Sequence, residues 1–474
     1  MNDEKIVLQI VEHHKKKENK PTGEIGITWW QLSLIGIGSI VGAGFFLGAS
    51  VAIKLTGPSV IIAFLIAGLI AYIAFNSLAE MKINDPETGS FRDYARKAFG
   101  DNMGFISGWM YWIAGVLIMS SEVTALSVFT RYWFPHIQLW IFSVIYSCLG
   151  LGINFLGVKD FGKIESFFAI VKITAIVTFI VFGALFILGY ASPEGSVDGA
   201  AVISLSTLDW FPQGITGLWS AMIFALFPFA GVAVVGAASK ELKKSESLTK
   251  AINALMLALI FLYVTSIAII LKMTYWNQIE VSKSPFITAL SEFHLPYLGS
   301  ILNVIIISAA FSTFVGALFA ITNVLLSLAK DGEAPKIALK KDKRGVNVIA
   351  LLIGASGLLV TILLSFVLPK TIYEYLTTSA GVLLISNWMI ILASQIKNRK
   401  NYQLKNTLVG KKFKMWFAPY SSYLGIFLIV LTLIGVSVNP MQRMGLFVSM
   451  GIVVIISISS LKAQSSRKKQ LRKQ

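Results

Sequence analysis

The sequence predicts an all-α polytopic membrane protein with twelve transmembrane helices. Two observations predict this fold class. Of the 474 residues, 55% are hydrophobic and only 14% are charged, whereas soluble domains carry about 25% charged residues. Apolar runs of about twenty residues also recur along the chain, and each is long enough to cross a bilayer as a helix. The composition excludes a soluble multidomain protein, because so few charges cannot cover its surface, and the mean hydropathy of +0.72 excludes a disordered chain.

Each apolar run is expected to be helical, because backbone polar groups in hydrocarbon must be hydrogen-bonded within their own segment. The twelve expected spans cover about residues 29–53, 57–80, 104–132, 139–157, 165–189, 215–238, 251–274, 298–328, 346–368, 373–395, 420–438 and 445–462. The expected organisation is an N-terminal tail at 1–28, a core at 29–395, two additional helices at 420–462 and a basic tail at 463–474. The tail at 1–28 is too polar and charged to be a cleavable signal peptide.

Basic residues lie almost entirely on one side of the expected spans. The formal net charge is +17, and 34 of the 41 Lys and Arg residues fall in the segments 1–28, 81–103, 158–166, 239–250, 329–345, 396–419 and 461–474. Because cytoplasmic loops are enriched in Lys and Arg, both termini are expected in the cytoplasm, at the plasma membrane. The basic runs 340–344 and 467–473 then belong to a face that meets anionic membrane lipid. No nucleic-acid partner is needed to explain them.

Several other function classes lose support from the residue inventory. Cys148 is the single cysteine, which excludes an intrachain disulfide and a cysteine metal site, and the four histidines have no metal-ligand spacing. The sequence has no Gly-x-x-x-x-Gly-Lys-Ser/Thr phosphate-binding loop, and no Ser/His/Asp or Cys/His set shares a segment. We therefore expect no enzyme activity, no cofactor and no bound metal. We also expect no obligate protein partner.

The first expected span contains five glycines within residues 36–48. Close helix packing through small residues explains two or three of them. The cluster Gly42, Ala43 and Gly44 is harder to explain by packing alone, because backbone without side chains favours local unwinding. The sequence therefore predicts a break in this helix near the middle of the membrane.

The sixth expected span is interrupted by Phe227-Pro228-Phe229-Ala230-Gly231. Proline removes a backbone donor and clashes with the preceding turn, so a plain kink is one interpretation and a break is the other. The interruptions lie in the first and sixth spans, five helices apart, and this offset favours a break. Paired interruptions in corresponding helices indicate inverted repeats with a midplane binding site. Free amides at such a break suit a carboxylate and free carbonyls suit an ammonium group. The residues thus predict a secondary transporter for a small zwitterion.

Two charged residues fall inside expected spans. Lys172 lies in the fifth span, where a lysine is costly and is a functional candidate; the alternative is that it snorkels to the membrane surface. A buried lysine can exchange a proton or stand as a fixed cation in place of sodium. Glu122 is the only acid well inside a span. It either pairs structurally with a polar neighbour or contributes to proton coupling or to binding of the substrate ammonium group. The hydroxyls of Ser308, Ser312 and Thr313 usually bond to their own backbone, a cation or proton site being the other interpretation.

Six segments resemble the amino acid–polyamine–organocation superfamily, and most closely its amino acid transporter (proton symporter) family. They are the Gly-rich 38–48, 86–91 with Tyr94-Ala95, 122–125 followed by 132–135, 159–162 leading to Lys172, Glu241 after the sixth span, and 328–335 after the eighth. The resemblance covers about residues 25–460. Each motif alone is weak, but all of them in order at the corresponding spans form a specific signal.

The resemblance implies a fold of the leucine-transporter type, with inverted five-helix repeats at about 29–189 and 215–395 forming the transport core. It also implies import of an L-amino acid with a proton by alternating access. By similarity, the backbone of Gly42, Ala43 and Gly44 holds the substrate carboxylate, and Lys172 stands where sodium sits in sodium-driven relatives. The residues expected to line the amino group and side chain of the substrate are Phe45, Phe227, Phe229, Ala230 and Gly231.

The chain departs from the family pattern at two positions. Members often carry Gly-x-Glu in the sixth span, where this chain has Ala233 in place of the acid, which argues against a cationic substrate. Many members carry an arginine where Asn323 stands, and nothing in the sequence explains this difference. The apolar lining residues favour a neutral amino acid. An obligate exchanger and a non-transporting amino acid sensor on the same fold are the alternatives.

Overall fold

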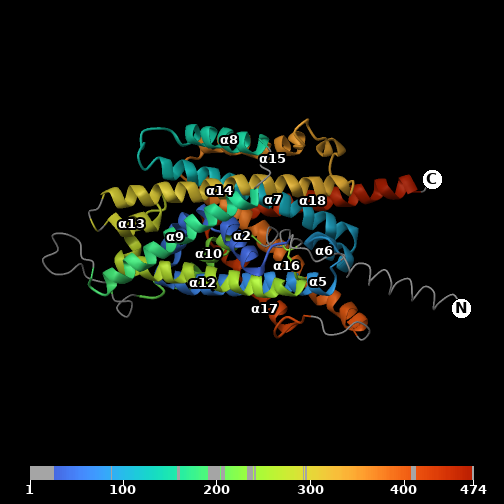
Figure 1. Ribbon diagram of the computed structural model, residues 1–474, viewed down its shortest axis with the longest axis horizontal. Coiled ribbons are helices and arrows are strands. Elements are labelled where there is room, and N and C mark those ends of the chain that lie inside the picture. The colour runs from blue at the N-terminus through green and yellow to red at the C-terminus, as the bar shows by residue number, and fades with distance from the viewer. Residues whose placement is uncertain are drawn as a thin grey trace.

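The computed structural model describes residues 26–86, 88–156, 161–190, 209–231, 242–291, 296–406 and 413–471, together with residues 203, 239 and 293. In these residues the regular elements are helices, and one isolated bridge joins Ile27 to Leu242. The long helices run side by side along the long axis of the molecule (Figure 1). The α-helices, long and short, are α2 (Trp29–Ile40), α3 (Ala43–Phe46), α4 (Gly48–Thr56), α5 (Val60–Asn84), α6 (Phe91–Phe99), α7 (Asp101–Thr130), α8 (Leu139–Phe155), α9 (Phe161–Ile187), α10 (Gly214–Leu226), α12 (Leu248–Met273), α13 (Pro285–Ser291), α14 (Pro296–Lys330), α15 (Val348–Val367), α16 (Ile372–Asn406), α17 (Tyr420–Val438) and α18 (Pro440–Leu471).

The outer surface of the helix bundle is apolar. Phe167 of α9, Leu363 of α15 and Ile455 of α18 are each more than half exposed, and many other large apolar side chains share that surface. Such a surface is covered by lipid hydrocarbon rather than by water. Nine stretches within the described residues are long and apolar enough to cross a membrane. The predicted class, an all-α polytopic membrane protein, is confirmed.

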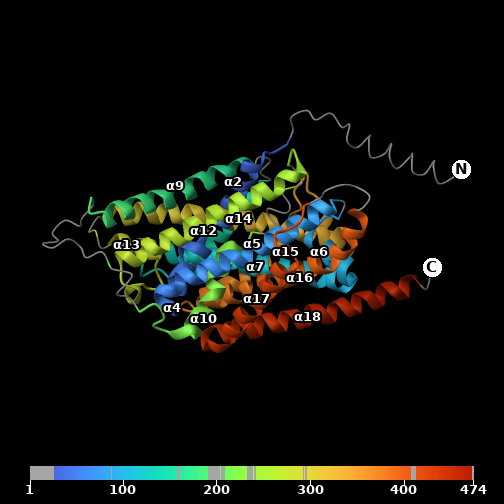
Figure 2. The ribbon, with the colours of Figure 1, turned by 90° about the horizontal axis from the view of Figure 1, so that it is seen from below.

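The helices differ in how deeply they lie in the bundle. In α16, 78% of the most apolar stretch is buried, whereas in α18 only 22% is buried. Figure 2 shows α18 along one edge of the bundle, next to α16 and α17. The short helices α2, α3 and α4 are surrounded by longer ones, and nearly all side chains of α3 and α4 are buried. The interrupted first span therefore lies at the centre of the molecule.

Glycines allow α14 to pack closely against its neighbours. A Cβ atom at Gly115 of α7 would come within 2.4 Å of Ile321, and one at Gly150 of α8 within 2.0 Å of Phe314. Small residues at such contacts let helix backbones approach in the absence of a hydrophobic driving force between helices. Helices α7 and α14 also supply Glu122 and Thr313, so their close packing fixes two polar side chains near the broken helix.

A network of ion pairs joins α6 to the segment after α14. Arg92 is buried and pairs with Asp331 and Glu333, its Nη1 lying 2.8 Å from Oε2 of Glu333. Arg96 reaches the same carboxylate, with 2.6 Å between Nη2 and Oε1. Helix α6, which follows the motif 86–91, thus meets the motif 328–335 at one end of the molecule and ties the α5–α7 connection to the segment after α14.

Replacing Arg92 with alanine is expected to lower the free energy of unfolding by about 2–3 kcal/mol, because the buried Glu333 would lose one of its two arginine partners and keep only Arg96. Chemical denaturation of the purified protein in detergent measures this change. Lys97→Ala is the matched control on the same helix, since Lys97 pairs with Asp85 at the surface and an exposed pair contributes about 1 kcal/mol or less. Equal effects of the two substitutions would contradict the buried character of the Arg92 pair.

Candidate functional site

The first membrane span is broken at Val41 and Gly42. Helix α2 ends at Ile40, both break residues have extended backbone, and a new helical segment begins at Ala43. The carbonyl of Gly42 accepts the first bonds of that segment, from the N–H groups of Phe45 at 3.1 Å and Phe46 at 3.2 Å. The N–H groups of Ala43 and Gly44 are therefore available for a partner from outside the helix.

Lack of space requires glycine on both sides of Ala43. A Cβ atom at Gly42 would lie 2.8 Å from Oε1 of Glu122 and 2.8 Å from Oγ1 of Thr313. A Cβ atom at Gly44 would lie 2.7 Å from the ring of Phe227. These distances are shorter than real Cβ contacts, so the glycine cluster serves close packing as well as the change of backbone direction.

The sixth span is interrupted directly against the first. Helix α10 ends at Leu226, the 3₁₀ turn η2 (Phe227–Phe229) follows, and Ala230 leaves helical geometry with ψ of 52°. A Cβ atom at Gly231 would come within 2.1 Å of Ile40, at the end of α2. Ala233 lies outside the described residues. The structure thus places the predicted residues Phe227, Phe229, Ala230 and Gly231 next to the break of the first span.

Glu122 is the partner of the free amides. It is buried in α7, and its Oε2 atom accepts a hydrogen bond of 3.0 Å from the N–H of Ala43. Since the amino-terminal end of a helix favours negative charge, Glu122 acts as a cap on the helical segment that begins at Ala43. The carboxylate therefore lies in the position that the resemblance assigns to the substrate carboxylate.

Lys172 lies fully buried on the other side of the same break. Its Nζ atom donates to the carbonyl of Gly38 at 2.5 Å and to Oγ1 of Thr313 at 2.9 Å. Thr313 in turn is within hydrogen-bonding distance, 3.1 Å, of the carbonyl of Val41. The lysine does not snorkel to the membrane surface. It satisfies a carbonyl in the last turn of α2, where the helix leaves its carbonyls without partners.

Two buried tyrosines also bond to the breaks, and the sequence reasoning did not find them. The hydroxyl of Tyr263 on α12 donates to the carbonyl of Pro228 at 3.2 Å, and that of Tyr373 on α16 donates to the carbonyl of Ala43 at 3.2 Å. Buried tyrosine hydroxyls require a partner. A tyrosine in the middle of an apolar span is the signal that points to Tyr263, whereas Tyr373 lies at the start of its span among interface residues.

Aromatic rings close the space around Phe45. Its ring stacks on Tyr263 with 3.9 Å between centroids and an interplanar angle of 23°, and meets Phe286 edge-on at 5.4 Å. Phe229 approaches Tyr263 at 5.2 Å. The predicted lining residues Phe45 and Phe229 therefore form one buried aromatic cluster with Tyr263. Such a cluster is suited to an apolar side chain.

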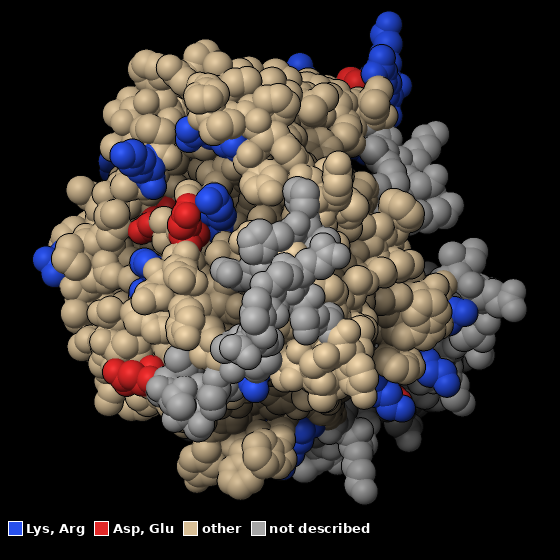
Figure 3. Space-filling view, turned by 90° about the vertical axis from the view of Figure 1, so that its left-hand side faces the viewer, with Lys and Arg blue, Asp and Glu red and all other residues tan. Residues whose placement is uncertain are grey.

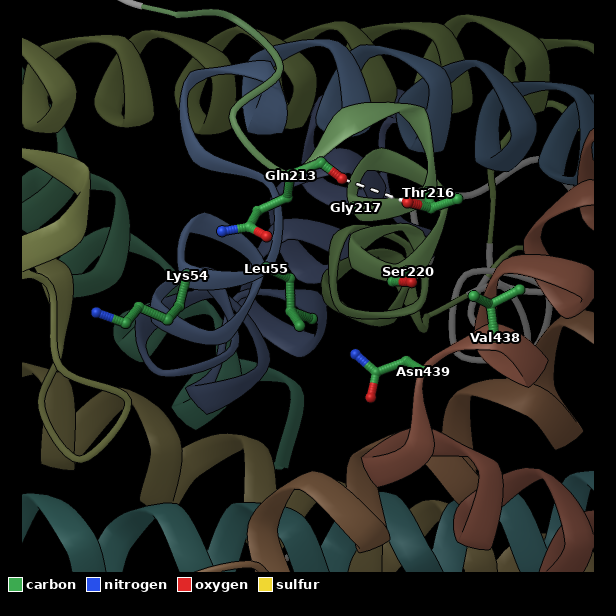
Figure 4. Close-up of a pocket in the computed structure, with 8 residues that line it drawn as sticks. All are labelled: Lys54, Leu55, Gln213, Thr216, Gly217, Ser220, Val438 and Asn439. Carbon is green, nitrogen blue, oxygen red and sulfur yellow. Dashed lines mark hydrogen bonds between the residues drawn. The ribbon is translucent and has the colours of Figure 1, made fainter.

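A separate cavity of about 280 Å³ lies beside α4 and α10, which Figure 2 shows toward the end of the molecule away from α6. The residues that line it come from the ends of α4, α10 and α17 and are Lys54, Leu55, Gln213, Thr216, Gly217, Ser220, Val438 and Asn439 (Figure 4). None of the predicted site residues belongs to this lining. Within the described residues, no group of three or more His, Cys, Asp and Glu side chains is placed to hold a metal ion.

A polytopic helical protein with two discontinuous helices meeting at its centre has the architecture of a secondary transporter. A sequence profile of the amino acid permease family matches residues 31–474, and the chain belongs to this family. The uncharacterized transporter YcgH of Bacillus subtilis (strain 168) is 40% identical over 445 residues, which cover 94% of this chain and 96% of the relative. The gamma-aminobutyric acid permease of the same organism is 32% identical over 91% of both chains. The aromatic amino acid transport protein AroP of Escherichia coli (strain K12) is 29% identical over 92% of this chain and 95% of the relative.

Family membership confirms the resemblance to the amino acid–polyamine–organocation superfamily. The chain is thus a multi-pass membrane transporter of the amino acid permease family and not an enzyme. The family also implies that its substrate is a small molecule of the amino acid class.

Proposed function

We propose that this permease imports a neutral L-amino acid across the plasma membrane together with a proton. The observation that carries the proposal is the contact between the two breaks, with Glu122 bonded to the amide of Ala43 and Lys172 bonded to the carbonyl of Gly38. Backbone groups of a broken helix and the two titratable side chains that bond to them thus meet in one buried place. This set of groups suits a zwitterion whose binding is linked to proton movement.

The proposed architecture has twelve spans and the inverted repeats 29–189 and 215–395, with broken first and sixth helices and two extra helices at 420–462. We place the tails 1–28 and 463–474 in the cytoplasm. The distribution of basic residues supports this orientation, because 34 of the 41 Lys and Arg residues fall in the segments assigned to the cytoplasm. Figure 3 shows the opposite end, at which α13 lies, where the visible Lys and Arg side chains are spread over the surface. The ion pairs of α6 then belong to the cytoplasmic side.

The proposed substrate site lies between the two breaks. The backbone of Gly42, Ala43 and Gly44 binds the substrate carboxylate, as the amino-terminal end of a helical segment does for anions. The segment 227–231 provides carbonyls for the amino group. The aromatic cluster around Phe45 supports a neutral, apolar side chain, because an unpaired charge in that environment is costly.

Glu122 links substrate binding to proton uptake in this proposal. Its ionised carboxylate accepts the N–H of Ala43, and a substrate carboxylate requires the same group. Protonation of Glu122 removes its charge, weakens its hold on the amides and leaves them to the substrate. Lys172, Tyr263 and Tyr373 are the titratable groups near this carboxylate, and Lys172 is the one that can take up the proton next.

A binding screen of the twenty amino acids and γ-aminobutyrate on the purified protein tests the proposed substrate class. Ligands that bind the folded state raise its stability by mass action, so a neutral L-amino acid is expected to raise the melting temperature most. Uptake of that compound into proteoliposomes, with and without an inward proton gradient, then tests the coupling. A cationic amino acid as the best ligand, or uptake that requires internal amino acid and ignores the gradient, would contradict the proposal.

Glu122→Gln is expected to make amino acid binding insensitive to pH. In the wild type, acidification protonates Glu122 and frees the amides, so affinity should rise as the pH falls. Glutamine keeps the size of the side chain but carries no charge at any pH, so the variant should bind at neutral pH as tightly as the wild type does at acidic pH. Equilibrium binding between pH 5 and pH 8 measures this, and a variant that retains the wild-type pH dependence would remove Glu122 from the coupling.

A further inference from the structure

Tyr263 contacts both breaks at once. It lies fully buried in the middle of α12, its ring stacks on Phe45 in the helical segment that follows the first break, and its hydroxyl donates to the carbonyl of Pro228 in the second. Phe229 meets the same ring at 5.2 Å. The apolar ring and the polar hydroxyl of one side chain therefore face the space in which the amino acid is proposed to bind.

The carbonyl of Pro228 has no backbone partner among the described residues. The N–H of Ala230 bonds to Phe227 at 3.0 Å and the N–H of Gly231 bonds to Phe229 at 2.8 Å, which leaves the carbonyl between them to the hydroxyl of Tyr263. Carbonyls at the carboxyl-terminal end of a helix carry partial negative charge and favour cations. The tyrosine hydroxyl thus occupies a position that is suited to an ammonium group.

The arrangement at the other break is complementary. There the carboxylate of Glu122 accepts a hydrogen bond from the amide of Ala43. This amide is the one that the carboxylate of a bound amino acid would require. The carboxylate of Glu122 occupies the position proposed for the substrate carboxylate. The hydroxyl of Tyr263 occupies the position proposed for the substrate amino group. Both breaks are consequently satisfied without substrate, and neither contains an unpartnered buried polar group at these positions.

We infer that Tyr263 selects for the α-amino group by exchange: its hydroxyl leaves the carbonyl of Pro228 when the ammonium group of the substrate binds there. The ring stays stacked on Phe45 and forms one wall of the side-chain pocket. A ligand without an amino group leaves the hydroxyl in place. The inference rests on the proposed function, because it takes the space between the breaks as the amino acid site.

Tyr263→Phe tests the exchange, because it removes the hydroxyl and retains the ring. The probes are L-phenylalanine with 3-phenylpropionate and L-leucine with 4-methylpentanoate, each pair differing by the amino group. In the variant the carbonyl of Pro228 has no partner until an ammonium group arrives, so both amino acids are expected to bind about fivefold more tightly than to the wild type. The two deaminated acids should bind with unchanged affinity, because the carbonyl is without a partner before and after they bind.

Tyr94→Phe is the matched control. Tyr94 is also buried, and its hydroxyl also donates to a backbone carbonyl, that of Asp85 at 2.8 Å, but it lies at the α6 end of the molecule. Its substitution is expected to leave the affinity for all four probes unchanged. The four compounds are titrated against the purified full chain by calorimetry, in parallel with thermal unfolding of each variant.

The outcomes separate the exchange from the proposed function. Wild-type protein that binds neither amino acid contradicts the proposed substrate site and the exchange together. A second outcome is that the wild type binds L-phenylalanine and L-leucine while folded Tyr263→Phe binds them with equal or weaker affinity. This result overturns the exchange alone. If this variant does not fold, 3-fluorotyrosine placed at position 263 keeps the hydroxyl and reports its surroundings: its fluorine resonance is expected to shift with L-phenylalanine and not with 3-phenylpropionate, and equal spectra overturn the exchange.

Discussion

Gly42→Leu is expected to abolish amino acid binding and uptake. Even the first carbon of a side chain at this position would lie 2.8 Å from both Glu122 and Thr313. These two side chains hold the amide of Ala43 and the amino group of Lys172, so any movement that makes room disturbs both. Gly42→Ala is expected to be the milder case, with a cost of about 2 kcal/mol from overpacking, which corresponds to about thirtyfold in affinity.

The measurement is equilibrium binding of L-phenylalanine and L-leucine to the purified variants, followed by uptake into proteoliposomes. Gly152→Ala is the control, because a Cβ atom there meets nothing within 4 Å, and it should bind and transport like the wild type. Thermal unfolding of the variants distinguishes lost binding from lost folding. Wild-type affinity in folded Gly42→Leu would place the carboxylate site away from Gly42, Ala43 and Gly44.

The location of both breaks follows from composition. Glycines at 42 and 44 and a proline at 228 remove side chains or backbone donors, and these are local effects that a sequence displays directly. The structure interrupts the first span at Val41 and Gly42 and the sixth after Leu226, next to the predicted positions. For Lys172, the sequence left open whether the side chain is buried or snorkels, and the structure shows it buried.

The side chains that bond to the two breaks could not be predicted in the same way. Glu122 bonds to Ala43 across 79 positions of sequence, and Lys172 bonds to Thr313 across 141. Such pairs depend on the angle at which α7, α9 and α14 pass the broken helix, which periodicity does not specify. The sequence therefore identified Glu122 and Lys172 as unusual and left open whether each is a structural partner or a functional group.

Helix ends also depart from the expected spans for a physical reason. Helix α16 continues to Asn406, although the apolar run that predicted it ends near residue 395. Hydrophobicity reports the thickness of the hydrocarbon layer, whereas a helix continues as long as its backbone bonds and its packing allow. Arg399 lies in this continuation and pairs with the buried Glu80 of α5, with 3.3 Å between Nε and Oε1, so tertiary contacts extend the helix beyond the apolar run.

Lys172→Ala is expected to uncouple transport from the proton gradient while leaving residual amino acid binding. The substitution removes the buried ammonium group and leaves the carbonyl of Gly38 and the hydroxyl of Thr313 without this donor. In proteoliposomes, wild-type uptake should rise with an inward proton gradient, whereas uptake by the variant should be the same with and without it. Lys370→Ala, at an exposed position, is the control and should retain the stimulation.

Lys172→Arg separates the two roles that a buried cation can have. Arginine keeps the positive charge but does not release a proton in proteins, and its planar head can still donate to the carbonyl of Gly38. If Lys172 exchanges protons, the arginine variant binds amino acid and loses the response to the gradient, as alanine does. If Lys172 serves only as a fixed cation in place of sodium, the arginine variant keeps gradient-driven uptake. Unchanged proton dependence in the alanine variant would exclude both roles and assign the coupling to Glu122 alone.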